Sequence, residues 1–344
     1  MTAHHRGTPN SRSLPHRSGG LVDNHGRPIT YLRLAITDRC NLRCRYCMPE
    51  EGVEFVPHAE ILAFEELERL VRLLVALGID KVRLTGGEPF VRHDCLPFMR
   101  RLRSIDGLRS LHVTTNGVET ARHLDGLADL GINGINLSLD TLERQRFFEI
   151  SRRDLLPQVL ATLDGCLKRR LPLKINAVVQ PNETTDAEIL ALAELPRRHP
   201  LSLRFIELMP FSGGQGRGHA PSSPLRERLQ GLFPGLVPVL VASPSTARQF
   251  TLPGFAGTIG LIEGNSRRFC ATCNKLRITP VGMLKTCLYD NGAVDLKAML
   301  RGGAGDAEIM QAVVTAVQNR FVDGHATQAA CQWQRQQSMA SIGG

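Results

Sequence analysis

Three cysteines, Cys40, Cys44 and Cys47, follow directly after an apolar segment that is typical of a β-strand. A cubane 4Fe–4S cluster normally takes four cysteine thiolates, one for each iron. The C-x3-C-x2-C spacing lets one short loop supply three of them, and no fourth cysteine lies nearby. One iron would keep an open position, and an open metal position is where a reactant can bind. The spacing therefore predicts a catalytic 4Fe–4S cluster rather than a zinc site or ordinary core cysteines.

A second group of cysteines, Cys270, Cys273 and Cys287, again offers three ligands. A zinc ion would need a fourth ligand, and only the distant His325 or Cys331 could supply it. A second 4Fe–4S cluster needs no more than the three thiolates that are present. We favour a second cluster here, and zinc remains the alternative.

Positively charged residues recur on segments that are predicted to be strands. In an extended chain alternate residues point to the same side, so Lys81 and Arg83 share a face, as do Lys275 and Arg277. Lys and Arg are almost never fully buried without a partner. The positions in question are Arg33, Lys81, Arg83, Arg204, Lys275 and Arg277. If these side chains point into the protein, a polyphosphate would explain them together.

The elements that must position these residues alternate between strand and helix from Tyr31 to about Leu208. Strands are expected at Tyr31–Ile36, Lys81–Leu84, Leu108–Thr114, Ile135–Leu139, Leu173–Val179 and Leu203–Leu208. Helices are expected at Phe64–Leu77, Ala121–Leu130, Pro157–Arg170 and Asp186–Glu194. Such alternation predicts parallel β/α units, whose strand ends share one functional face. Six units are too few for a closed eight-stranded barrel, so we expect an α/β fold with an open, partial barrel.

The chain is expected to fall into four parts. Residues 1–20 are predicted to be a disordered tail, and residues 21–211 to form the partial barrel. Glycine and proline recur in residues 212–247, which we interpret as a connector. Residues 248–344 are expected to form a smaller region that carries the second cluster and ends in a Gly-Gly tail.

Composition limits the partners and the compartment. The net charge of +9, from 42 Lys and Arg against 33 Asp and Glu, suits an anionic partner. No dense basic run with interleaved aromatics favours nucleic acid, and no apolar stretch approaches the ~18–20 residues of a membrane helix. The nine cysteines are an odd number and follow no secretory signal, which favours a reducing, cytoplasmic location.

Taken together, these motifs resemble the GTP 3′,8-cyclase family of the radical S-adenosylmethionine (radical SAM) superfamily. The resemblance runs in order from about residue 21 to the terminal Gly343-Gly344. It rests on Thr37-Asp-Arg-Cys40 and the cysteines after it, Lys81-Val-Arg-Leu-Thr-Gly-Gly-Glu-Pro, Thr114-Thr-Asn-Gly, Asn136-Leu-Ser-Leu-Asp, Arg204-Phe-Ile-Glu-Leu-Met and Cys270-Ala-Thr-Cys-Asn-Lys-Leu-Arg. The family usually has Arg where this chain has Lys275, which keeps the charge and loses the fork-shaped guanidinium.

The resemblance implies a reaction and a set of site residues. SAM cleaved at the first cluster would give a 5′-deoxyadenosyl radical that takes the 3′ hydrogen of GTP. The C3′ radical would then attack C8, an early step of molybdopterin biosynthesis. Matching positions for SAM are Tyr46, Gly87, Ser138 and Met209. Those for GTP are Arg33, Lys81, Arg83, Thr114, Lys174, Arg204, Lys275, Leu276 and Arg277. The second cluster would bind guanine, and Arg277, Gly343 and Gly344 would support catalysis.

The resemblance also implies partners: GTP, an electron donor such as flavodoxin or ferredoxin, the downstream cyclic pyranopterin monophosphate synthase, and a second copy of the chain in a homodimer. Two alternatives stay open at this point. One is another radical SAM enzyme with an auxiliary cluster, of the peptide-maturing type. The other is a zinc-stabilised nucleic-acid-binding protein, which would be colourless and stable in air.

Overall fold

Six parallel β/α units form the centre of the computed structural model, which describes residues 20–49, 52–209, 225–239, 245–264, 268–331 and 339–343. Their strands are β1 (Tyr31–Ala35), β2 (Lys81–Thr85), β3 (Ser110–Thr115), β4 (Gly134–Ser138), β5 (Leu173–Val179) and β6 (Ser202–Glu207). Each pairs in parallel with the next along the chain. The expected strands all form, with ends within two residues of those predicted. The expected tail at residues 1–20 lies outside the described residues except for Gly20.

Residues after β6 lengthen the same sheet at both ends. Strand β9 (Thr258–Ile262) pairs in parallel with β6, and β10 (Lys275–Ile278) pairs in parallel with β1. Antiparallel strands complete the edges, with β8 (Arg248–Thr251) and β7 (Val237–Val239) beyond β9, and β11 (Met283–Lys285) and β12 (Val294–Asp295) beyond β10. The strand order runs from β12 to β7 without closing. The open α/β barrel expected from the sequence is confirmed, with two further parallel strands.

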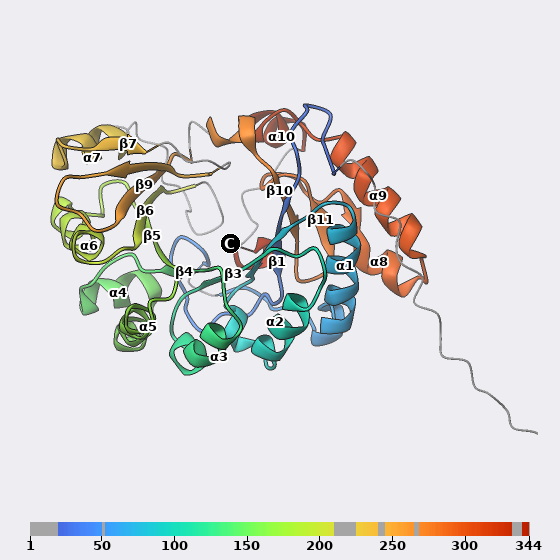
Figure 1. The fold of residues 1–344 in the computed structure, drawn as a ribbon, viewed down its shortest axis with the longest axis horizontal. Coiled ribbons are helices and arrows are strands. Elements are labelled where there is room, and N and C mark those ends of the chain that lie inside the picture. The colour runs from blue at the N-terminus through green and yellow to red at the C-terminus, as the bar shows by residue number, and fades with distance from the viewer. Residues whose placement is uncertain are drawn as a thin grey trace, which may run out of the picture.

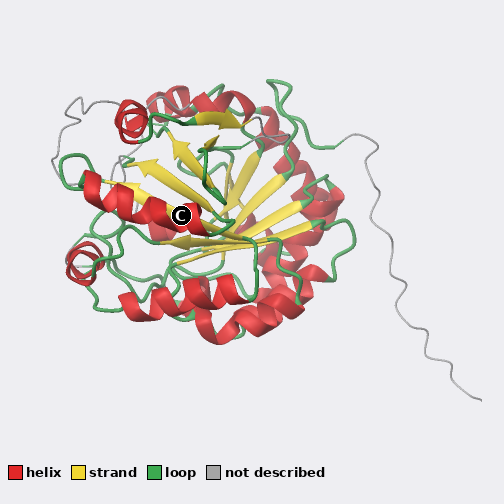
Figure 2. Cartoon of the chain, turned by 60° about the vertical axis from the view of Figure 1, so that its left-hand side comes forward, coloured by secondary structure: helices red, strands yellow, loops and turns green. Residues whose placement is uncertain are grey.

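Helices cover the convex side of this curved sheet (Figures 1 and 2). Those of the β/α units are α1 (Phe64–Ala76), α2 (Cys95–Arg103), α3 (Leu124–Asp129), α4 (Arg144–Ser151), α5 (Leu156–Lys168) and α6 (Asp186–Arg198). Later helices are α7 (Leu225–Leu232), α8 (Leu296–Arg301), α9 (Asp306–Gln318), α10 (Gly324–Ala330) and α11 (Met339–Ile342). Short 3-10 helices occupy His58–Glu60, Pro89–Val91, Thr120–His123 and Arg268–Thr272. The range interpreted as a connector thus contains α7 and β7.

The core lies between the helices and the convex face of the sheet. In α1, Leu67, Leu70, Val71 and Leu74 repeat at helical spacing and are buried, so this stripe faces the strands. Leu32 of β1 is buried in the same core. None of the helices in the described part of the chain combines the length and the apolar character that a membrane crossing requires.

The concave face carries polar residues in rows, because alternate residues of a strand point to the same side. Register places Arg277, Arg33 and Arg83 side by side on β10, β1 and β2; we call this the arginine row. Two residues before these arginines, on the same face of the same strands, lie Lys275, Tyr31 and Lys81. Further rows are formed by Thr114, Asn136 and Lys174, and by Ser138, Asn176 and Arg204. Parallel pairing therefore gathers cations that are distant in sequence.

Candidate active site

Both cysteine groups line one cavity of about 590 Å³ on the concave face of the sheet. The cysteines are Cys40, Cys44, Cys47, Cys270, Cys273 and Cys287. The cavity also extends along the rows of polar residues on β1 to β6 and β10. A single cavity therefore joins two sets of thiols to a set of cations.

The first cysteine loop is folded tightly after β1. The amides of Cys47 and Met48 both donate to the carbonyl of Cys44 at 2.9 Å, which turns the chain around that residue. The loop is also tied to α4, since the amide of Arg45 donates to the carbonyl of Ile150 at 2.9 Å. Burial raises the pKa of Cys40 to about 12. A metal that binds this sulfur as a thiolate must therefore displace its proton.

Two glycines let the loop after β2 lie against the backbone of the cysteine loop. The amide of Gly87 donates to the carbonyl of Thr37 at 2.8 Å, and that of Glu88 donates to the carbonyl of Arg39 at the same distance. A Cβ at Gly87 would lie 2.2 Å from the carbonyl oxygen of Arg39. Gly86 has a φ of +147° and would place a Cβ 2.4 Å from the oxygen of Thr37. Only glycine fits between these two segments.

Gly87→Ala is expected to lower the free energy of unfolding by about 1–3 kcal/mol, because the two backbone segments must separate to admit a methyl group. The shift would move the cysteine loop, so iron content after anaerobic reconstitution should fall as well. Thermal unfolding and iron analysis measure the two effects. Gly231→Ala is the matched control, because a Cβ there meets nothing within 4 Å and alanine favours a helix. Equal stability of the two variants would contradict this account of Gly87.

Glu88 links the loop after β2 to the loop after β3. Its fully buried carboxylate accepts hydrogen bonds from the amide of Asn116 at 2.6 Å and from the hydroxyl of Thr115 at 2.8 Å. Burial raises the pKa of Glu88 to about 7. The side chain of Asn116 in turn donates to Asn41 at 2.7 Å, within the first cysteine loop. Sequence reasoning included Glu88 only as part of the Gly-Gly-Glu-Pro motif and missed this bracing role.

The second cysteine group is held by buried charged residues. Arg27 donates to the carbonyl of Cys270 at 2.9 Å, and Arg320 donates to the carbonyl of Cys273 at 3.3 Å. Asp23 accepts from both arginines, at 2.7 and 3.1 Å, so the three side chains form one buried network. None of the three was singled out from the sequence, because Arg320 lies 297 residues after Asp23.

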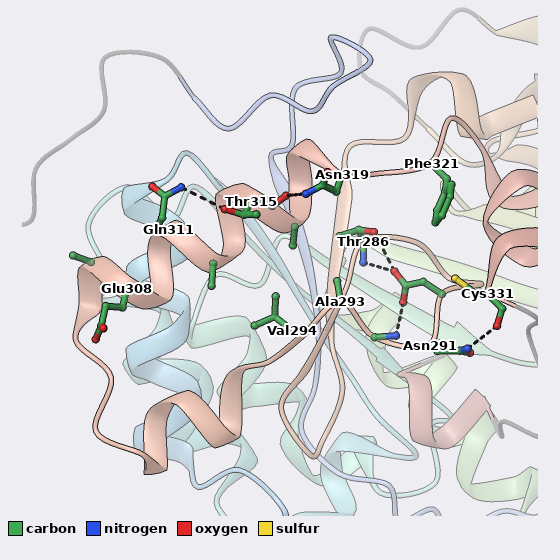
Figure 3. A pocket seen from close by; sticks show the side chains of 15 residues that line it. Thr286, Asn291, Ala293, Val294, Glu308, Gln311, Thr315, Asn319, Phe321 and Cys331 are labelled. Atoms are coloured by element: carbon green, nitrogen blue, oxygen red, sulfur yellow. Dashed lines mark hydrogen bonds between the residues drawn. The ribbon is translucent and has the colours of Figure 1, made fainter.

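The loop of Cys287 is braced by Asp290. Its Oδ2 atom accepts from the amide of Cys287 at 2.8 Å and from the amide of Thr286 at 2.7 Å. Thr286 also lines a second cavity of about 830 Å³ beside α9 (Figure 3). Cys331 lines that second cavity rather than the one that holds the six cysteines, and its carbonyl accepts from Asn291 at 2.8 Å.

Each cysteine group offers three thiols, the donor type that iron–sulfur clusters take. Within the described ranges, no three His, Cys, Asp or Glu side chains converge so as to hold one metal ion. In a cubane cluster each thiolate ligates a different iron, so the ligands need not converge. The chemistry of three cysteines per group matches that requirement without a fourth residue.

The positions matched to SAM and GTP meet in the cavity, with one exception. Those that line it are Tyr46, Gly87, Ser138, Met209, Arg33, Lys81, Arg83, Thr114, Lys174, Arg204, Lys275 and Arg277. Leu276 instead packs in the core on the convex side of β10. Tyr46 donates to Asp140 at 2.8 Å, and Asp140 accepts from the amide of Val178, also at 2.8 Å. Sequence reasoning missed Asp140 as a partner, although it follows β4 in the Ser-Leu-Asp motif.

The cations of the cavity are crowded and partly without partners. Burial and the nearby Arg277 lower the pKa of Arg33 to about 9, and its Nε atom is buried without a hydrogen-bond partner. Burial and Arg204 lower the pKa of Lys174 to about 8. The Nε atom of Arg204 is also buried without a partner. Because such groups are costly to bury alone, the cavity is suited to a multiply charged anion.

The C-terminal end of the chain lies inside the curve of the sheet, as both views show (Figures 1 and 2). The carbonyl of Gly343 accepts from Arg277 at 3.1 Å and from Arg33 at 3.5 Å. Ile342 is buried against Tyr289, beside Cys287 and Met209. Gly343 has a φ of +84°, which favours glycine. Gly344 lies outside the described residues.

Comparison with known proteins first gives the class. A model of the radical SAM superfamily matches residues 34–195, and one described as Molybdenum Cofactor Synthesis C matches residues 201–325. The structure of Streptococcus suis SuiB bound to the precursor peptide SuiA has the same fold, with a TM-score of 0.58, 15% identity and coverage of 87% of this chain and 67% of that one. Fold and site therefore define a radical SAM enzyme.

Closer relatives then give the family. "GTP 3′,8-cyclase" of Moorella thermoacetica is 39% identical over 94% of this chain and all of the relative, and that of Pelotomaculum thermopropionicum is 40% identical with the same coverage. The mouse "Molybdenum cofactor biosynthesis protein 1" is 42% identical over 87% of this chain. The chain spans about half of that longer protein, 48% of its length. The chain belongs to the GTP 3′,8-cyclase family.

Proposed function

We propose that this chain converts GTP to (8S)-3′,8-cyclo-7,8-dihydroguanosine 5′-triphosphate, an early step of molybdenum cofactor biosynthesis. The observation that carries the proposal is the single cavity lined by two cysteine triplets and the arginine row. The names of the relatives that match nearly the whole chain support the same reaction. The likeness to SuiB concerns the fold alone and gives no support to a peptide substrate.

The cysteines and four further residues would hold the cofactors. Cys40, Cys44 and Cys47 would bind the first 4Fe–4S cluster, and Cys270, Cys273 and Cys287 the second. SAM would contact Tyr46, Gly87, Ser138 and Met209. When bound, the first cluster and SAM would supply the radical chemistry that removes the 3′ hydrogen of GTP, and these residues would hold them beside the substrate. Asp140 would fix the orientation of the Tyr46 ring through their 2.8 Å hydrogen bond.

The cations would hold GTP by its triphosphate. Arg33, Arg83 and Arg277 stand in one row, and arginine forks suit paired phosphate oxygens. Lys174 and Arg204 approach from β5 and β6. Thr114, whose hydroxyl is buried without a partner, is free to hydrogen-bond the nucleotide. Lys81 and Lys275 would add charge, and Lys275 would do so as a point charge where the family usually has the arginine fork.

The tail and the partners complete the proposal. Gly343 and Gly344 would support the rearrangement of the substrate beside Arg277, and the second cluster would bind the guanine edge. We also propose a one-electron donor such as flavodoxin or ferredoxin, hand-off to cyclic pyranopterin monophosphate synthase, assembly as a homodimer, and action in the cytoplasm.

Anaerobic turnover of GTP deuterated at C3′ tests the reaction. With SAM and a reductant, the reconstituted enzyme should give the cyclised triphosphate and carry deuterium into 5′-deoxyadenosine. Mass spectrometry of both products is the measurement, and GTP deuterated at another ribose carbon is the control. Cleavage of SAM with no deuterium transfer from C3′ would contradict the proposed reaction.

A further inference from the structure

Tyr31 is a cavity residue that the motifs do not explain. It lies on β1 two residues before Arg33, on the same face of the sheet, and its side chain is almost completely buried. Its hydroxyl accepts a hydrogen bond from Nε of Arg83 at 2.5 Å. That short contact joins the phenol to the arginine row.

Cations surround the Tyr31 ring. Cross-strand pairing places Lys81 on one side and Lys275 on the other, with their amines 4.8 and 5.7 Å from the ring centre. The charged groups that bear on the phenol are Arg33 of β1, Lys81 and Arg83 of β2, Lys275 and Arg277 of β10, Lys174 of β5 and Arg204 of β6. His112 of β3 lies beyond Arg83 and is kept neutral, since burial and Arg83 lower its pKa to about 2.

This setting favours a negative oxygen on Tyr31. Burial alone raises the pKa of a phenol, but Arg83, Arg33 and Lys81 outweigh it and lower the pKa of Tyr31 to about 7. Above that pH the phenolate balances part of the positive charge. A polyphosphate in the same cavity would supply negative charge of its own, and a second anion beside it would be repelled.

We propose that Tyr31 is a built-in counter-anion and positioning residue of the anion subsite: its phenolate oxygen holds Arg83 until a polyphosphate binds, and then takes up a proton from solvent. The proton leaves water and forms the O–H bond of Tyr31, which removes the negative charge from this oxygen and weakens its hold on Arg83. The guanidinium, whose Nη1 also donates to the carbonyl of Val113 at 3.2 Å, can then turn its charge toward phosphate. The inference rests on the proposed function only in identifying the natural anion with a nucleoside triphosphate. It makes binding of that anion dependent on pH.

The sign of the pH dependence follows from linkage. When binding takes up one proton, affinity falls by up to tenfold for each pH unit above the pKa of the free site, here above about pH 7. Tyr31→Phe keeps the ring and removes only the oxygen, so its affinity should not follow this slope. The variant should bind about as well as the wild type near pH 6 and at least tenfold more tightly near pH 9.

The experiment uses the anaerobically reconstituted enzyme and inorganic tripolyphosphate, with GTP as a second ligand. Calorimetry in buffers of different ionisation enthalpy measures affinity and proton uptake together. Lys174 could also take up a proton when an anion binds, because its pKa is lowered to about 8. Lys174→Met is therefore a companion variant, which separates proton uptake at Lys174 from proton uptake at Tyr31. The chain has three tyrosines, so the Cζ resonance of labelled Tyr31, identified by its loss in Tyr31→Phe, reports its proton directly.

Weaker binding by Tyr31→Phe at every pH would overturn the proposal, because it would mean that the hydroxyl only orders Arg83. An unchanged Tyr31 resonance on binding would overturn it as well. Proton uptake at Tyr31 with tripolyphosphate, in an enzyme that forms no cyclised product, would leave this inference standing and refute the proposed function. Formation of the cyclised product without proton uptake at Tyr31 would refute this inference and leave the proposed function standing.

Discussion

Replacing Cys40, Cys44 and Cys47 together with alanine is expected to remove about half of the iron, about four of about eight atoms per chain, and to abolish reductive cleavage of SAM. All three thiols line the cavity, and no other cysteine group lies on the same loop. The fold should persist, because the loop is held by backbone hydrogen bonds to α4 rather than by the sulfurs. Iron and sulfide analysis of anaerobically purified protein, with 5′-deoxyadenosine quantified beside it, measures the effect.

Two controls sharpen that result. Cys95→Ala changes a buried thiol of the hydrophobic core and should leave iron and SAM cleavage unchanged. Alanine at Cys270, Cys273 and Cys287 should also halve the iron, while some SAM cleavage remains and cyclised product is lost. Tightly bound zinc with no labile sulfide in the wild-type protein would falsify the cluster assignment for both groups.

Gly343→Ala is expected to lower formation of the cyclised product by at least tenfold, while both clusters and SAM binding remain. A Cβ there would lie 2.7 Å from the Cβ of Ala35 and 2.8 Å from the hydroxyl of Thr85. The added methyl group would push the tail out of its place, and the carbonyl of Gly343 would lose Arg277. A tenfold loss corresponds to about 1.4 kcal/mol in the barrier, less than a hydrogen bond to a charged group can contribute.

The matched control is Gly303→Ala, at a turn far from the cavity. Gly303 has a φ of +83°, almost the same as Gly343, but a Cβ there meets nothing within 4 Å. Both variants carry the same backbone strain, so a difference in turnover isolates the contact of the tail. Deleting residues 343 and 344 should act as Gly343→Ala does. Full turnover by the deletion variant would show that the tail has no part in the reaction.

Local patterns account for the features that could be predicted from the sequence. The cysteine spacings, the alternation of Lys81 with Arg83, and the glycines before Glu88 each lie within a few residues of one another. Strand–helix alternation predicts parallel order for neighbouring units, and β1 to β6 follow it. Helices α2 and α4 were not predicted, because with 9 and 8 residues they are too short to show a helical repeat over several turns.

Features that depend on long-range pairing could not be predicted. Nothing local to Lys275 indicates that β10 lies beside β1, yet that pairing aligns Arg277 with Arg33 and flanks Tyr31 with two lysines. The signal that could have found Tyr31 is its position two residues before Arg33 on the same strand. In the network of Asp23, Arg27 and Arg320, the pair of Asp23 and Arg27 is local, but no local pattern indicates Arg320, which joins them from 297 residues away.

The pairing of β10 with β1 has a consequence for how the molecule can be assembled. Although β1 begins the sheet in sequence, it lies within it, and Thr30 meets Asn274, 244 residues later. The six β/α units alone would leave β1 and β6 unpaired on their outer edges, and such edges are templates for association with other chains. Contacts at this sequence separation also slow folding, because the intervening chain must be closed into a loop first. During synthesis, the N-terminal half of the sheet therefore cannot complete its strand pairing by itself. The outer edge of β1 stays exposed until β10, a strand synthesised much later, has been made.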